Sequence, residues 1–171
     1  LNENSYTWYV NQYKDHPAIL MWEFGNEFNY HPEWFGGNID NWYSLLETAA
    51  ANVKTIDPNH PVSTGNGEVP SLDVINSCPS VDVWGMNIYR FLNTTSAITD
   101  LASYSDKAMY ISESGADSFN NNQQSENQSQ QALATEQILN SVLSYSDLCA
   151  GITLFEFCDE WWKAGDPNSH D

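Results

Sequence analysis

Ala18-Ile-Leu-Met-Trp-Glu-Phe-Gly-Asn-Glu27 is the first of two stretches that decide the fold of this chain. The second is Ala108-Met-Tyr-Ile-Ser-Glu113-Ser-Gly-Ala-Asp117. Each is a short apolar run that ends in a glutamate and continues into residues typical of loops. Barrels of parallel strands present carboxylates at their carboxyl edge in this way. The two stretches therefore predict an α/β fold in which Glu27 and Glu113 lie at the same edge of a sheet.

The rest of the chain supplies further strands and the helices between them. Near-continuous apolar runs are typical of parallel strands that are buried on both faces. The predicted strands are Ile19–Phe24, Pro61–Thr64, Val81–Met86, Met109–Ser112 and Gly151–Phe157. Helical spacing of apolar residues predicts helices at Ser5–Tyr13, Asp40–Thr55, Thr95–Tyr104 and Gln130–Ser146, and the Asn- and Gln-rich segment Asn120–Gln131 is predicted to be a polar loop.

The spacing of these elements narrows the choice of architecture. From Ile19 to Gly151 each strand-to-strand step averages about 33 residues, which is close to the roughly 31 residues of one βα unit in a (β/α)8 barrel. A doubly wound sheet has similar spacing, so the periodicity leaves both folds open.

Composition limits the partners of the chain. With 171 residues and a net charge of −18, it forms one acidic domain that nucleic acid and anionic membranes would repel. A neutral polysaccharide would not be repelled. The three cysteines have no CxxC spacing and the histidines have no metal-ligand spacing, so the sequence predicts no zinc site, metal or cofactor.

The strand-end residues define a candidate reaction. Two facing carboxylates are the minimum chemistry for cleaving a glycosidic bond. Glu27 can protonate the leaving oxygen and Glu113 can attack the anomeric carbon. Asn26 can donate to a sugar hydroxyl, although a helix cap is an alternative role for Asn26-Glu27. Tyr89 can orient Glu113, although a simply packed tyrosine is equally consistent with the sequence.

Other residues are candidates for binding substrate. The adjacent tryptophans in the last segment suggest a cleft wall more than a core. The full set of predicted substrate-binding residues is Asn26, Tyr89, Trp161, Trp162, Trp22, His31 and Asn87.

These motifs resemble those of retaining glycoside hydrolases with (β/α)8 barrels. The segment from Lys14 to Glu27 is similar to their fourth strand, in which Asn-Glu supplies the acid/base. The segment ending in Glu113 is similar to strand seven, which carries the nucleophile. Val83–Tyr89 resembles strand six and Phe155–Lys163 resembles strand eight. The chain is most like the catalytic barrel of glycoside hydrolase family 2, with family 5 and the glucanosyltransferases more distant.

The resemblance implies that residues 1–171 are the C-terminal portion of a TIM barrel, about strands four to eight, with the rest supplied by sequence outside the chain. It also implies double displacement, with the carboxyl groups of Glu27 and Glu113 about 5–5.5 Å apart. Ser114 departs from the aromatic residue that is frequent at that position. A transglycosylase, and a non-catalytic structural or carbohydrate-binding barrel in an extracellular assembly, are the alternatives. Sequons at Asn93 and Asn127 predict a secreted glycoprotein.

Overall fold

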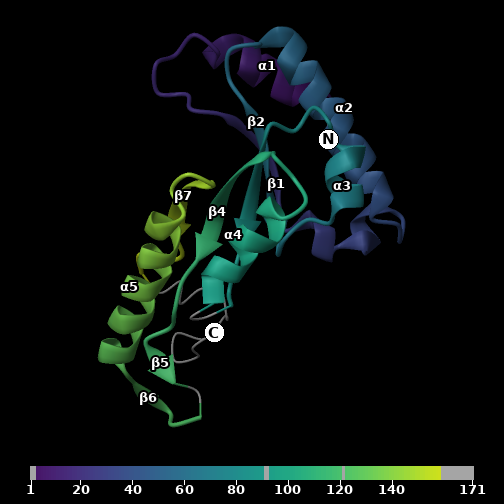
Figure 1. Ribbon diagram of the computed structural model, residues 1–171. Helices are drawn as coiled ribbons and strands as arrows, with labels where there is room; N and C mark the ends of the chain where they lie inside the picture. The colour runs from purple at the N-terminus through teal and green to yellow at the C-terminus, as the bar shows by residue number, and fades with distance from the viewer. Residues whose placement is uncertain (1–2, 91–92, 121, 159–171) are drawn as a thin grey trace.

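Five parallel strands pair in the order β1-β2-β3-β4-β7 in a computed structural model that describes residues 3–90, 93–120 and 122–158 (Figure 1). The strands are β1 (Trp22–Asn26), β2 (Val62–Gly67), β3 (Val83–Asn87), β4 (Ala108–Ser114) and β7 (Cys149–Leu154). Their order follows the chain without reversal, whereas a doubly wound sheet reverses at its switch point. The strand order thus selects the barrel-type sheet from the two folds that the spacing allowed.

All five strands differ from their predicted bounds by one to three residues, and β1 and β7 show why. Pairing of β1 begins at Trp22, whose backbone N–H donates to Pro61, so the apolar residues Ile19–Met21 precede the strand. β7 begins two residues earlier than expected and ends at Leu154. Both shifts arise because hydrophobicity marks burial, while the limits of a strand are set by backbone pairing.

Helices form in every interval where the spacing predicted one. They are α1 (Glu3–Tyr13), α2 (Asp40–Ile56), α4 (Thr94–Ala102) and α5 (Gln128–Ser144), together with an unpredicted helix, α3 (Leu72–Ser77). Ser71 begins α3, because its hydroxyl accepts the backbone N–H of Val74. Two short 3₁₀ helices, η1 (Phe28–Tyr30) and η2 (Pro32–Phe35), follow Glu27.

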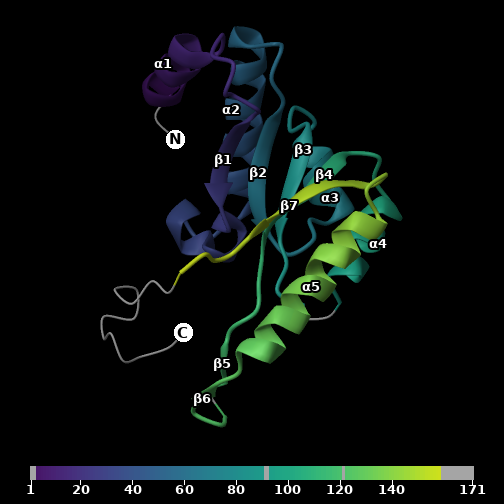
Figure 2. The same cartoon turned by 90° about the vertical axis from the view of Figure 1, so that its left-hand side faces the viewer.

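The segment 120–131 is not wholly a loop, which corrects the prediction for it. It contributes to a short antiparallel hairpin of β5 (Phe119–Asn120) and β6 (Ser125–Glu126), and then to the first turn of α5. Asn127 caps α5 by accepting the backbone N–H of Gln130. The hairpin follows β4 and projects beyond the carboxyl end of the sheet in both views (Figures 1 and 2).

One face of the sheet packs against helices. The side chains involved are fully or almost fully buried and belong to the same hydrophobic cluster as residues of α2 and α4. They alternate along the strands and comprise Phe24, Val62, Trp84, Met86, Met109 and Ile111. Burial of these side chains is the main stabilising contribution that the sheet makes. Among the described residues no helix is long and apolar enough to cross a membrane.

The opposite face is concave and carries polar or small residues. The Tyr110 hydroxyl on β4 hydrogen-bonds the carboxylate of Glu23 on β1, although two strands, β2 and β3, lie between them. Neighbouring strands are about 4.8 Å apart, so a flat sheet would separate β1 and β4 by roughly 14 Å. The tyrosine ring lies over Gly85, where a Cβ atom would be 2.8 Å from ring carbons. Curvature therefore brings side chains from distant strands together on this face, as it does inside a barrel.

Candidate active site

Glu27 follows β1 at a local break in the strand pairing. The register with β2 shifts between Glu23 and Asn26, and Gly25 has a positive φ of 73°. Glu27 itself adopts the left-handed region with φ 55° and donates its backbone N–H to Gly65 at 2.8 Å. A non-glycine residue held in this region is a mark of functional sites. The bulge turns Asn26 and Glu27 relative to the regular strand.

Asn87, at the end of β3, connects the two predicted catalytic segments. Its side-chain N–H groups donate to Asn26 Oδ1 at 3.0 Å and to Glu27 Oε1 at 3.1 Å. Its Oδ1 accepts the hydroxyl of Ser112 at 2.6 Å. Ser112 immediately precedes Glu113, so a continuous row of hydrogen bonds runs from the first glutamate segment to the second.

Tyr89 contacts the second glutamate directly. Its hydroxyl donates to Glu113 Oε2 at 3.0 Å, and Asn87 is the register partner of Glu113 across the β3–β4 pair. Burial raises the pKa of the Tyr89 hydroxyl, and the negative charges of Glu113 and then Glu27 raise it further. The hydroxyl thus stays protonated as a donor, and it lies within the electrostatic reach of both carboxylates.

Contacts of Asn29 and Tyr30 with Gly67, which the sequence did not indicate, fix the loop after Glu27. Asn29 exchanges two hydrogen bonds with the backbone of Gly67, donating to its carbonyl at 2.9 Å and accepting its N–H at 2.8 Å. Tyr30 packs its ring on the same glycine, where a Cβ atom would lie 2.2 Å from a ring carbon. Burial, and then the charges of Glu68 and Glu27, raise the pKa of the Tyr30 hydroxyl. The half-exposed Tyr30 ring is thereby held beside the candidate acid/base.

The only arginine of the chain ties the ends of β2 and β3 together. Arg90 donates through Nε to both carboxylate oxygens of Glu68, at 3.0 and 3.2 Å. It also donates to Ser96 at 2.8 Å and to Asp100 at 3.0 Å. These bonds hold the backbone just after Tyr89, and no spacing rule in the sequence could have paired the residues.

Trp22 does not join the residues around Glu27. It stands at the opposite end of β1, and its indole N–H donates to the buried Asp57 carboxylate at 2.8 Å. The prediction that Trp22 stacks on sugar is therefore corrected, because Trp22 lies at the amino end of β1 and the active sites of such barrels lie at the carboxyl ends of the strands. Trp161 and Trp162 lie outside the described residues.

His31 lies in the loop that follows Glu27. Its ring stacks on Trp34 with centroids 3.9 Å apart, and its Nδ1 is 2.7 Å from Glu33. Its role in substrate binding stays a prediction. The sequon residues Asn93 and Asn127 are exposed at the starts of α4 and α5, and their glycosylation also stays a prediction.

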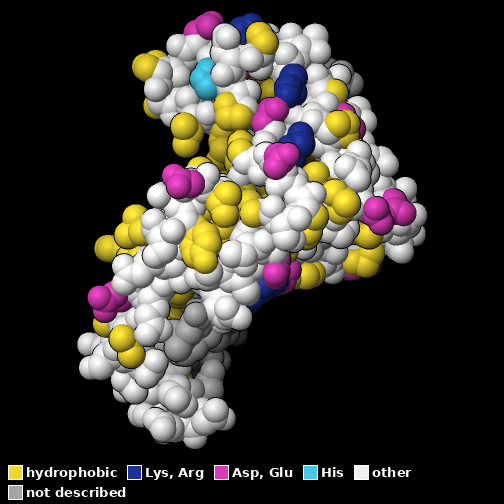
Figure 3. Space-filling model, viewed as in Figure 1, with side chains coloured by type: hydrophobic (Ala, Val, Ile, Leu, Met, Phe, Trp, Pro, Cys, Tyr) yellow, Lys and Arg dark blue, Asp and Glu magenta, His cyan; other side chains and the backbone are white. Residues whose placement is uncertain are grey.

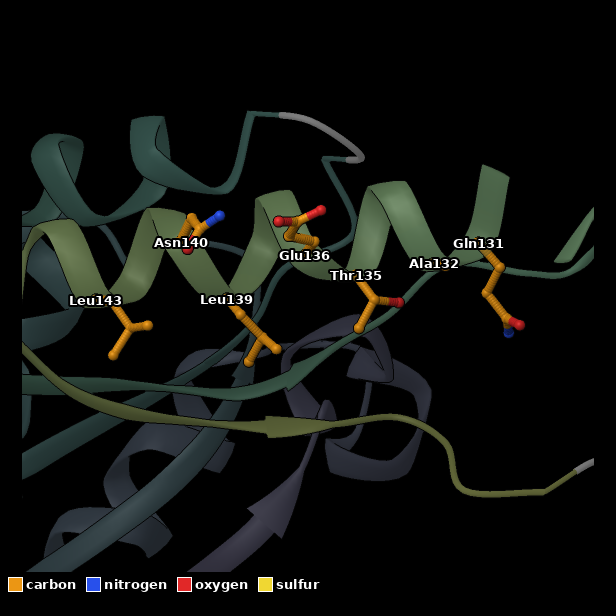
Figure 4. A pocket seen from close by; sticks show the side chains of 7 residues that line it. All are labelled: Gln131, Ala132, Thr135, Glu136, Leu139, Asn140 and Leu143. Atoms are coloured by element: carbon orange, nitrogen blue, oxygen red, sulfur yellow. The ribbon is translucent and has the colours of Figure 1, made fainter. Parts of the chain in front are cut away.

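A separate hollow of about 470 Å³ lies on the surface of α5 (Figure 4). Its lining comes from successive turns of that one helix and comprises Gln131, Ala132, Thr135, Glu136, Leu139, Asn140 and Leu143. A single carboxylate on a helix surface offers no pair of groups for catalysis, so this hollow is not the candidate site. In the described part of the chain, no three His, Cys, Asp or Glu side chains gather as metal ligands.

The curved parallel sheet, with helices on one face and functional side chains at its carboxyl ends, is that of a (β/α)8 or TIM barrel. Solved structures with this fold cover most of the chain. A β-glucuronidase of Bacteroides uniformis superposes with a TM-score of 0.71 over 91% of the chain, at 17% identity. An endo-1,4-β-D-mannanase of Thermotoga petrophila gives 0.65 over 89%, at 15% identity, and a GH113 β-1,4-mannanase gives 0.62 over 89%, at 18% identity.

Sequence comparison finds a shorter match. The chain is 43% identical over 56 residues to mannan endo-1,4-β-mannosidase F of Aspergillus clavatus and 39% identical over 57 residues to that of Aspergillus fumigatus. Each match covers 33% of this chain and 12% of the relative. The chain spans about half the length of the two mannanase structures and a fifth of the glucuronidase, at 53%, 51% and 21%. No protein-family model matches the sequence.

The structural likeness extends over several groups of glycoside hydrolases. It includes a family 2 member from Bacteroides cellulosilyticus with a TM-score of 0.57, as well as the GH113 mannanase. The comparisons therefore confirm the TIM-barrel fold and do not select family 2, which the sequence motifs resembled most.

Proposed function

We propose that the protein is a retaining β-glycoside hydrolase in which Glu113 is the nucleophile and Glu27 the acid/base. The observation that carries the proposal is the row of hydrogen bonds Glu27–Asn87–Ser112, which leads to Glu113 at the end of the neighbouring strand. A purely structural sheet has no need for two carboxylates at its carboxyl edge, each held by a neutral donor from β3 or the residues just after it.

The contacts suggest how the two steps proceed. Tyr89 holds Oε2 of Glu113, so Oε1 attacks the anomeric carbon and forms the glycosyl-enzyme bond. The bond from that carbon to the leaving oxygen breaks as the oxygen takes the proton of Glu27. In the second step Glu27 removes a proton from water, and the resulting hydroxide displaces Glu113. A sugar hydroxyl in place of water would give transglycosylation. The expected separation of the carboxyl groups, about 5–5.5 Å, stays a prediction.

A neutral β-1,4-mannan is the substrate that we propose, and charge favours it over a glucuronide. A glucuronide brings a carboxylate, which needs a cation in the site. Each lysine and arginine in the described residues is already bonded to a carboxylate or a backbone carbonyl, namely Lys14, Lys54, Arg90 and Lys107. On the face shown in Figure 3 the few dark-blue side chains lie close to magenta ones. The named mannosidases that match 56 or 57 residues support the same choice.

The test is hydrolysis by the purified protein that contains this chain. We expect it to release reducing ends from β-1,4-mannan, and to form the product first in the β configuration by proton NMR. Glu27→Gln and Glu113→Gln should each lower activity by at least about 100-fold, while Glu126→Gln on the exposed hairpin serves as the matched control. Equal activity in all three variants would refute the assignment. A folded protein inactive on every glycoside would support a non-catalytic barrel.

A further inference from the structure

The side-chain amide of Asn87 is buried and fully used by its neighbours. Asn87 is 2% exposed, so it has little contact with solvent or with a substrate in the cleft. Its two N–H protons go to Asn26 and Glu27, and its oxygen accepts from Ser112. The sequence-based prediction placed Asn87 among substrate-binding residues, whereas these contacts point to a different role.

The orientation of this amide is fixed by its partners. The carboxylate of Glu27 can only accept a hydrogen bond when it is ionised, so the nitrogen of Asn87 must face it. The oxygen of Asn87 then faces Ser112, which has a hydroxyl proton to donate. The nitrogen end of the amide therefore faces two acceptors and the oxygen end faces one donor, and turning the amide over would place its oxygen against a carboxylate oxygen.

We propose that Asn87 is a positioning residue that decides which oxygen of Glu27 carries the catalytic proton. This proposal rests on the proposed function, because it concerns the same acid/base. Asn87 donates to Oε1 in both protonation states, so the proton of the acid form resides on Oε2. The proton passes from Oε2 to the leaving oxygen as the glycosidic bond breaks, and Oε2 later accepts a proton from water. Asn87 keeps both of its protons throughout.

The backbone supports the same assignment. Glu27 is fixed at its N–H by Gly65 and is held in the left-handed region, so its side chain starts from a defined position. One further contact at Oε1 then sets the rotation of the carboxyl group about its last bond. Without that contact, the proton-bearing oxygen could turn away from the leaving group, and proton donation would fail in a fraction of encounters.

Leaving-group dependence separates this role from a structural one. Departure of 2,4-dinitrophenolate needs no proton, whereas departure of phenolate or of a sugar does. We expect Asn87→Ala to lower kcat/KM roughly 10- to 100-fold for a phenyl glycoside and less than about 3-fold for the 2,4-dinitrophenyl glycoside. Asn66→Ala is the matched control, because Asn66 is also a buried asparagine at a strand end, bonded to Tyr43 and to backbone carbonyls. Its variant should affect both substrates equally.

Two further variants keep the test decisive if Asn87→Ala does not fold. Asn87→Asp keeps the size of the side chain and the acceptor for Ser112 but removes the donor to Glu27. We therefore expect kcat/KM again to fall more for the phenyl glycoside than for the 2,4-dinitrophenyl glycoside. Ser112→Ala keeps the Asn87 N–H donor and removes the hydroxyl that holds the Asn87 oxygen. We expect a smaller loss of kcat/KM, again larger for the phenyl glycoside than for the 2,4-dinitrophenyl glycoside. Equal losses on both substrates in these variants would overturn the proposal. Failure of the wild-type protein to hydrolyse either glycoside would instead overturn the proposed function.

Discussion

Replacing Tyr89 by phenylalanine removes one hydroxyl from the candidate site and leaves the ring in place. The hydroxyl donates to Glu113 at 3.0 Å. A hydrogen bond to a charged group contributes about 1.5–3 kcal/mol, and because Tyr89 is 50% exposed, water replaces part of it. We therefore expect a loss of about 1–2 kcal/mol of transition-state stabilisation, or roughly 5- to 30-fold in kcat/KM.

The assay is kcat/KM of the wild type and Tyr89→Phe on an activated aryl β-mannoside, measured from pH 7 to about pH 10. The raised pKa of Tyr89, caused by burial and then by Glu113 and Glu27, keeps its hydroxyl protonated over this range. The ratio of kcat/KM of the wild type to that of Tyr89→Phe should therefore stay constant over this pH range. Ionisation of the hydroxyl would remove the donor and make the ratio fall as pH rises.

Tyr104→Phe is the matched control for the loss of a hydroxyl. Tyr104 donates to the backbone carbonyl of Pro70 at 2.6 Å and does not contact either glutamate. This variant should lower the free energy of unfolding by about 0.5–1.5 kcal/mol and leave kcat/KM unchanged. Equal activities of Tyr89→Phe and the wild type, or an equal loss in Tyr104→Phe, would refute the role assigned to Tyr89.

Two other predictions concern stability. Burial alone would raise the pKa of Asp57, but hydrogen bonds from Trp22 and then His60 outweigh burial and lower that pKa. The ionised Asp57 carboxylate therefore stabilises the folded state above about pH 4, and this stabilisation is lost on acidification. Asp57→Asn should thus lower the unfolding free energy by about 1–2 kcal/mol at pH 7 in urea denaturation, and a gap that fails to narrow below pH 4 would contradict this. Gly67→Ala should lower the free energy of unfolding by about 1–3 kcal/mol, because its new methyl group clashes with the Tyr30 ring, and by less when Tyr30 is also replaced by alanine. Additive effects in this double-mutant cycle would show that the ring does not cause the loss of stability.

The order of strands and helices was predictable because hydrophobic patterning is local. Apolar runs ending at Glu27 and Glu113 mark strands whose ends carry carboxylates, and both residues follow or end a strand as expected. The contact between Tyr89 and Glu113 was one of two interpretations of the sequence, and the hydrogen bond supports it. The same patterning failed for α3, which has six residues and buries only Ile75, too few positions to show a period.

Individual contacts between segments far apart in the sequence could not be predicted. Nothing local in the sequence says that Tyr110 reaches Glu23 across two strands, or that Asn29 clamps Gly67. Trp22 shows the converse error. An aromatic residue near a catalytic motif suggests sugar stacking, but the length of the strand places it at the other end, against Asp57.

The measurement that tests the central claim most directly is mass spectrometry of the protein after exposure to 2-deoxy-2-fluoro glycosides with activated leaving groups. The fluorine slows the second step, so a retaining enzyme accumulates the glycosyl-enzyme. We predict one adduct per protein on Glu113, formed most readily with the mannoside and absent in Glu113→Gln. A folded protein that hydrolyses glycosides but carries its adduct on another residue, or forms none with any sugar, would contradict the assignment of Glu113 as the nucleophile.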